Sequence, residues 1–168
     1  IDGSASAGSD FNSVGLTTIS FLPGEISKTI SIGLIDDIQF EQTEGFSVTL
    51  SNPTHAVIDD GVGLGTIFDN DSAAVIINES NTITRVEEAG TTDSYEIVLN
   101  SQPTADVVIT ISPDAQIDLG TGAGNAISRT FTVQNWNTAQ TVVVTAVDDN
   151  IAEGSHQSNL QHATTSSD

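Results

Sequence analysis

Alternation of apolar and polar residues with a period of two is the feature that most constrains the fold of this chain. It runs through short segments that are rich in β-branched residues and bounded by Gly, Pro, Asn or Asp. These segments are residues 17–22, 28–34, 46–50, 63–68, 74–78, 94–99, 107–111, 128–133 and 141–147. The pattern is typical of half-buried antiparallel strands, and no segment has a capped 3.6-residue period that predicts a helix. The sequence therefore predicts an all-β fold of antiparallel β-sandwiches.

A weak internal repeat predicts two domains in tandem. Residues 30–37 and residues 142–149 both read as a strand that ends in paired aspartates, and a glutamate follows each pair at the same distance. The copies are about 112 residues apart, a long period for the strands of one sandwich. We therefore expect domains at residues 1–72 and 73–168. The pair lies early in the first domain and late in the second, so we expect the first to lack its opening strands and the second its closing strands. A longer array or neighbouring copies would supply the missing strands.

The charge balance restricts the partners of the chain. The 168 residues include 23 Asp and Glu but only 3 Lys and Arg, which gives a formal net charge of −20. Nucleic acid is therefore excluded as a partner because phosphate binding requires basic patches, and an anionic membrane surface is disfavoured. Divalent cations are the natural counter-charge. The hydrophobic fraction of 37% falls in alternating runs, which argues against disorder.

Other compositional features bear on location and chemistry. The chain has no Cys, so it has neither disulfides nor thiolate metal ligands. No apolar stretch approaches the roughly 20 residues of a membrane span, so membrane insertion is not expected. The three His residues have no companions at the spacing of a metal site. Few Lys and Arg, no Cys and abundant Thr, Ser, Asp, Asn and Gly indicate a secreted or cell-surface protein.

Acidic residues gather in loops of the first domain. One group follows the strand at residues 28–34, another ends the segment at residues 63–68, and Asp10 lies in a Gly/Ser loop. Alternate loops of a sandwich meet at one end, and Ca²⁺ takes 6–8 oxygen ligands at about 2.3–2.6 Å. The alternative is that each acid is solvated or caps a turn. That alternative suits any single aspartate, whereas the whole group favours a shared cation because of like-charge repulsion.

The first domain closely resembles the Calx-beta domain of sodium–calcium exchanger regulatory regions, integrin β4 and large bacterial surface proteins. The resemblance lies in DGSASAGSDF (2–11), ISFLPGE (19–25), IDDIQFEQTEGF (35–46), LSNP (50–53) and GTIFDND (65–71). It implies an immunoglobulin-like β-sandwich that binds Ca²⁺ in its distal loops. The implied ligands are Asp10, Asp36, Asp37, Gln39 through its carbonyl, Glu41, Glu44, Asp69, Asn70 and Asp71.

The second domain resembles a divergent Calx-beta-like repeat of bacterial, including cyanobacterial, multi-repeat proteins. The similar stretches are VEEAG (86–90), LNSQPTAD (99–106), NWNTAQ (135–140) and VDDNIAEG (147–154). The implied ligands are Glu88, Asp148, Asp149 and Glu153. His156 stands where the first domain has Glu44, and it is a poor Ca²⁺ ligand. A full site is therefore less expected here.

These observations lead to one functional hypothesis and two alternatives. The chain is predicted to be a calcium-binding structural or adhesive segment of a large extracellular or cell-surface bacterial protein. Ca²⁺ would stiffen the acidic loops and the domain junction, and the further partners would be neighbouring repeats, other copies, surface proteins or glycans. The alternatives are a filament or matrix subunit assembled by strand sharing, and a Ca²⁺-sensing module as in exchangers. An enzyme is not expected, because carboxylates clustered in one loop suit shared coordination better than attack across a sugar.

Overall fold

The computed structural model describes residues 3–167, which fall into two compact units divided after Asn70. All regular structure in the described residues is β, as the two-residue alternation predicts. Every ladder between its strands is antiparallel. Within residues 3–167 there is no helix of the length and hydropathy that a membrane crossing requires.

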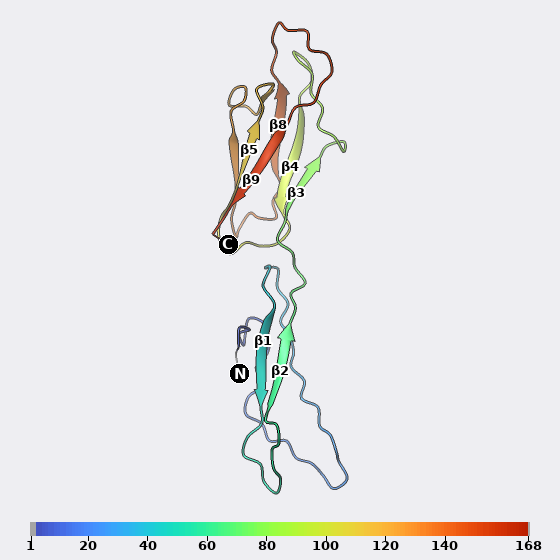
Figure 1. Ribbon diagram of the computed structural model, residues 1–168, viewed down its shortest axis with the longest axis vertical. Helices are drawn as coiled ribbons and strands as arrows, with labels where there is room; N and C mark the ends of the chain where they lie inside the picture. The colour runs from blue at the N-terminus through green and yellow to red at the C-terminus, as the bar shows by residue number, and fades with distance from the viewer. Residues whose placement is uncertain (1–2, 168) are drawn as a thin grey trace. The chain divides into compact units, whose positions relative to one another are not determined.

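The second unit is a sandwich of two antiparallel sheets (Figure 1). One sheet has the order β3-β4-β8-β6, with β3 at Val75–Glu79, β4 at Asp93–Leu99, β8 at Gln140–Ala146 and β6 at Ile117–Asp118. The other has the order β7-β5-β9, with β7 at Ile127–Phe131, β5 at Val107–Pro113 and β9 at Leu160–Thr165. Neighbours in the first sheet include strands that are far apart in sequence, so the sandwich closes through long-range pairing.

Alternate residues of these strands form one hydrophobic core between the two sheets. Buried side chains recur at every second position along β4, β5 and β8. The largest that are fully buried are Phe131, Ile97, Ile109, Ile111, Val142 and Val144. Because side chains alternate between the two faces of a strand, the buried apolar residues of β4, β5 and β8 share the inner face. This is how the sequence alternation produces the sandwich.

A partly buried hydrogen bond joins the two sheets of the second unit. The hydroxyl group of Tyr95 in β4 lies 2.8 Å from Nε2 of His162 in β9, and the two rings meet edge to face at 5.5 Å. Burial raises the pKa of Tyr95 to about 12 and lowers the pKa of His162 below its usual value of 6.5. The tyrosine therefore keeps its proton, and burial favours the neutral form of the imidazole.

The burial of His162 makes the stability of the second unit depend on pH. The pKa of His162 is lower in the folded state than in the unfolded state, so the unfolded chain binds the proton first as the pH falls. The stabilising contribution is therefore present above about pH 6.5 and is lost as the pH falls below it. We expect His162→Gln to flatten the decrease in melting temperature between pH 7.5 and pH 5. His55→Gln in the first unit is the control, and an unchanged pH dependence in His162→Gln would contradict the assignment.

Within residues 3–70, the first unit has a single two-stranded sheet. Its strands β1 (Glu44–Thr49) and β2 (Val62–Ile67) pair antiparallel over six residue pairs. The strands predicted at residues 17–22 and 28–34 are wrong, because both segments run without a ladder apart from a single bridge between Phe11 and Leu34. An alternating sequence becomes a strand only where another backbone lies beside it to pair with.

Two strands of the second unit were not predicted from the sequence. They are β6, which has only two residues, and β9, which follows the paired aspartates and pairs with β5 over six positions. A paired strand therefore follows the aspartates of the second unit. In β9 only Leu160 is a large apolar residue, so the strand is defined by its pairing with β5 rather than by local alternation.

Candidate metal centre

Asp10 is fixed in a tight loop near the start of the chain. Its backbone N–H donates to the carbonyl of Ser6 at 3.0 Å, and its Oδ2 accepts the backbone N–H of Ser6. The side chain is buried, with 7% of its surface exposed. Two hydrogen bonds to one residue thus leave the carboxylate of Asp10 in a single, well-defined position.

The loop that carries Asp10 is tied to the beginning of β1. The N–H of Ala5 donates to the carbonyl of Gly45 at 3.1 Å, and the N–H of Gly45 donates to Oγ of Ser4 at 2.9 Å. The ring of Phe11 stacks on the ring of Phe46, with centroids 4.7 Å apart. These contacts place Asp10 beside the first residue of β1.

Phe46 keeps this position partly because the facing strand has a glycine. A Cβ atom at Gly65 in β2 would collide with the ring of Phe46. The ring therefore lies across β2 on one side and against Phe11 on the other. Only glycine permits so close an approach of ring and backbone.

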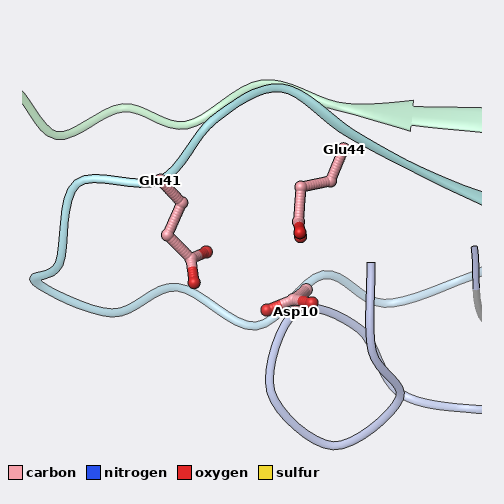
Figure 2. Close-up of side chains that lie close together, drawn as sticks. All are labelled: Asp10, Glu41 and Glu44. Atoms are coloured by element: carbon pink, nitrogen blue, oxygen red, sulfur yellow. The ribbon is translucent and has the colours of Figure 1, made fainter. Parts of the chain in front are cut away.

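Three carboxylates converge at this point (Figure 2). Asp10 comes from the loop, Glu41 from the segment before β1, and Glu44 from the first position of β1; one oxygen of each lies within 4.8 Å of the others. Two oxygens on opposite sides of a Ca²⁺ ion would be about 4.6–5.2 Å apart, twice the metal–oxygen distance. One ion can therefore contact all three. The donors are all carboxylate oxygens, which suit a hard cation such as Ca²⁺.

The electrostatics of this cluster favour a cation. The pKa of Glu41 is raised by partial desolvation and by the negative charges around it, which are those of Asp10, Asp37 and Asp69. The pKa of Glu44 is also raised, first by desolvation and then by a hydrogen bond and repulsion from Asp10. Without a cation the folded state thus disfavours the charged forms of both glutamates. A bound cation reverses this effect.

Other predicted ligands surround the cluster without joining it. Oδ2 of Asp69 accepts the backbone N–H of Glu41 at 2.8 Å, and Nδ2 of Asn70 donates to Oδ1 of Asp36 at 3.1 Å. The segment of residues 69–70 therefore lies beside the loop that follows residue 35, although the two are far apart in sequence. Asp37 accepts the N–H of Gln39 at 2.8 Å, a turn-capping contact. The carboxylates of Asp36, Asp37, Asp69 and Asp71 lie outside the group of three.

The predicted ligands of the second unit are arranged differently. Oε1 of Glu153 accepts Nε2 of Gln116 at 2.7 Å, and its other oxygen lies 3.8 Å from Nε2 of His156. Asp149 caps a turn by accepting the N–H of Ile151 at 2.6 Å. Among residues 3–167, Glu88, Asp148, Asp149 and Glu153 form no group of three converging ligand atoms.

The residues that hold Asp10 in place were not predicted from the sequence. Ser6 binds Asp10 twice, and Ser4 bonds to β1. The signal available in the sequence is the run of small residues GSASAGS before Asp10. Such a run allows the chain to turn tightly and brings backbone N–H groups close to a carboxylate.

Comparison with known proteins identifies the family. The Calx-beta domain model matches residues 1–81 and again residues 69–164. The chain belongs to the Calx-beta family. The two matches confirm tandem Calx-beta domains, and the family agrees with the all-β architecture described above.

The Calx-beta chain is also similar to curated exchangers. It is 33% identical over 173 residues to sodium/calcium exchanger 1 of Rattus norvegicus, and 31% identical to that of Canis lupus familiaris. Each of these alignments covers 88% of the chain and 17% of the exchanger. Sodium/calcium exchanger 3 of Homo sapiens is 33% identical over 111 residues, which is 53% of the chain and 12% of that protein. The chain therefore spans less than a fifth of the length of these relatives.

Proposed function

We propose that this chain is a calcium-binding module whose ion is held by Asp10, Glu41 and Glu44. The convergence of these carboxylate oxygens within 4.8 Å carries the proposal. Membership of the Calx-beta family and similarity to proteins named sodium/calcium exchangers support calcium as the cation. The function is one of binding, without catalysis.

Each residue has a definite part in this function. Asp10, Glu41 and Glu44 bring their oxygens to one point from three segments of the chain, so an ion would cross-link those segments. Backbone carbonyls and water would complete the 6–8 ligands that Ca²⁺ takes. The acids that lie outside the group, including Asp37 and Asp69, add to the negative potential that attracts a cation.

The wider role we propose is structural or adhesive. The chain would be part of a large extracellular or cell-surface bacterial protein, next to further repeats, and calcium would stiffen its acidic loops. The absence of Cys and the scarcity of Lys and Arg support this location. Other copies, surface proteins or glycans would be its partners.

The calcium affinity distinguishes this role from regulation. Equilibrium dialysis of the whole chain at physiological salt is expected to give a Kd of about 10⁻⁴–10⁻³ M, the range of extracellular modules. A Kd of about 10⁻⁷–10⁻⁵ M is typical of calcium sensors. A measured Kd in this range would favour a regulatory role, as the similarity to exchangers suggests, over the structural role. The absence of saturable binding would contradict both.

Strand sharing is supported by a separate observation. The first unit exposes large apolar side chains along its β1–β2 sheet, among them Leu64, which is 84% exposed. A face of this kind favours association with another strand. This second candidate function does not depend on the calcium site.

A further inference from the structure

The loop that follows the paired aspartates begins with the same turn in both units. In the first unit Oδ1 of Asp37 accepts the backbone N–H of Gln39 at 2.8 Å. In the second unit Oδ1 of Asp149 accepts the backbone N–H of Ile151 at 2.6 Å. These residues correspond in the internal repeat, which matches each position of the first unit to the one 112 positions later. The repeat is therefore one of structure as well as of sequence.

A second pair of backbone contacts matches Gln116 to Asp10. The carbonyl oxygen of Asp10 accepts the N–H of Ile35 at 3.0 Å, and the carbonyl oxygen of Gln116 accepts the N–H of Val147 at 2.9 Å. Ile35 and Val147 correspond in the repeat. In both units the next residue along the chain also pairs antiparallel with the residue that precedes Ile35 or Val147. Gln116 thus stands where the first unit has Asp10.

The side chains at the matched positions differ in charge. Where the first unit brings three carboxylates together, the second unit has Gln116, Glu153 and His156. Glu153 and His156 are three residues apart, as are the two glutamates of the first site. Because Glu153 is the single acid of these three residues, the like-charge repulsion of the first site does not arise among them.

Both oxygens of Glu153 face nitrogen atoms of the protein. Nε2 of Gln116 donates to Oε1 of Glu153 at 2.7 Å. Nε2 of His156 lies 3.8 Å from Oε2 of Glu153, and the two groups form an ion pair when the imidazole is protonated. The side chain of Glu153 is 22% exposed, so these contacts replace part of its hydration. The positive ends of N–H bonds therefore serve this carboxylate as a cation would.

We propose that the second unit closes this loop with its own side chains, and that the Gln116 amide and the His156 imidazole take the place that calcium has in the first unit. The bond from Gln116 to Glu153 ties the loop between β8 and β9 to the residue before β6. An ion would tie the matching segments of the first unit. Calcium therefore stabilises the first unit and not the second. This inference rests on the proposed function and assigns its calcium dependence to one unit.

Trp136 allows the second unit to be observed separately in the whole chain. It is the only Trp of the sequence, and it packs against the core of the second unit. Its fluorescence during thermal unfolding therefore reports the melting temperature of that unit. We expect this melting temperature to be the same in millimolar Ca²⁺ and in excess chelator.

The first test is made in excess chelator and does not involve calcium. Gln116→Glu keeps the shape of the side chain but places a second carboxylate beside Glu153, so it is expected to lower the melting temperature reported by Trp136. Gln157→Glu adds the same charge at an exposed position of the same loop and is the matched control. The double variant Gln116→Glu/Glu153→Gln restores one donor and one carboxylate in exchanged positions. It is expected to recover most of the loss, which a general disturbance of the loop would not allow.

The second test transfers the calcium requirement to the second unit. Gln116→Asp together with His156→Glu gives this unit the same three carboxylates as the first. In excess chelator the double variant is expected to melt lower than the wild type, and millimolar Ca²⁺ is expected to reverse this loss. If the first unit responds to calcium and this variant of the second unit does not, the roles of Gln116 and His156 are contradicted.

The proposal is also overturned if Gln116→Glu melts no lower than Gln157→Glu in chelator. A calcium-dependent rise of the melting temperature reported by Trp136 in Glu44→Gln would overturn it too, because the first site has lost a ligand in that variant. The calcium shift of the first unit tests the proposed function separately. If that shift is absent, the proposed function fails, and the result in chelator still decides whether Gln116 and Glu153 close the loop.

Discussion

Calcium is expected to raise the melting temperature of the first unit. At about 100 times its Kd, a ligand that binds only the folded state adds roughly 2.7 kcal/mol to the free energy of unfolding. The unfolded chain does not bring Asp10, Glu41 and Glu44 together, so it binds the ion far more weakly. Thermal unfolding of the whole chain in millimolar Ca²⁺ and in excess chelator measures the difference.

The variant Glu44→Gln tests which residues cause this shift. It removes one ligand and one negative charge, whereas Asp59→Asn removes a negative charge from an exposed loop of the same unit. If the substitution weakens binding 100-fold, only about 0.4 kcal/mol of the stabilisation remains at the same calcium concentration. Asp59→Asn is expected to keep the full shift. An equal shift in Glu44→Gln and in the wild type would contradict the assignment.

The same substitution has the opposite effect without metal. The pKa of Glu44 is raised in the folded state by desolvation and by Asp10, so its negative charge opposes folding at neutral pH. In excess chelator, Glu44→Gln is therefore expected to melt no lower than the wild type. One substitution would then weaken the calcium-bound form and spare the metal-free form, a combination that a simple packing defect does not produce.

Removal of the central aromatic ring of the second unit is expected to have the largest effect on stability. Phe131 is fully buried in β7, within the core between the two sheets. Phe131→Ala loses the transfer free energy of the ring and leaves a cavity, at a cost of about 3–5 kcal/mol. Because domains of this size are stable by only about 5–15 kcal/mol, the melting transition of the second unit should fall steeply or disappear.

The first unit provides an internal reference for that experiment. The three carboxylates belong to residues 1–70 and Phe131 to residues 71–168, so the calcium-dependent shift is expected to survive in Phe131→Ala. Val143→Ala is the matched control, because Val143 lies on β8 with 51% of its surface exposed and its truncation should change stability by less than about 0.5 kcal/mol. Loss of the calcium shift in Phe131→Ala would show that the first unit depends on the second for its fold.

The fold was predictable where local alternation and tertiary pairing agree. Residues 94–99, 107–111 and 141–147 alternate strongly, and each lies in a paired strand of the sandwich. Residues 28–34 alternate equally well, yet they form no strand, because within residues 3–70 no backbone pairs with them apart from the bridge between Phe11 and Leu34. The polar strand β9 shows the converse, since pairing with β5 makes a strand of a sequence with little alternation.

The candidate site was predictable in its chemistry but not in its geometry. The sequence indicates an oxygen-only cation site and includes Asp10, Glu41 and Glu44 among its ligands. It does not distinguish these three from the acids around them. That distinction comes from contacts between distant segments, such as the bond from Gly45 to Ser4 and the stacking of Phe11 on Phe46. No local pattern encodes such contacts.

The most direct test of the calcium site is a crystal structure of the chain grown in calcium at a concentration that saturates the thermal shift. We expect one ion between Asp10, Glu41 and Glu44, with a carboxylate oxygen of each at about 2.3–2.6 Å. An ion bound elsewhere, or none near these residues, would contradict it.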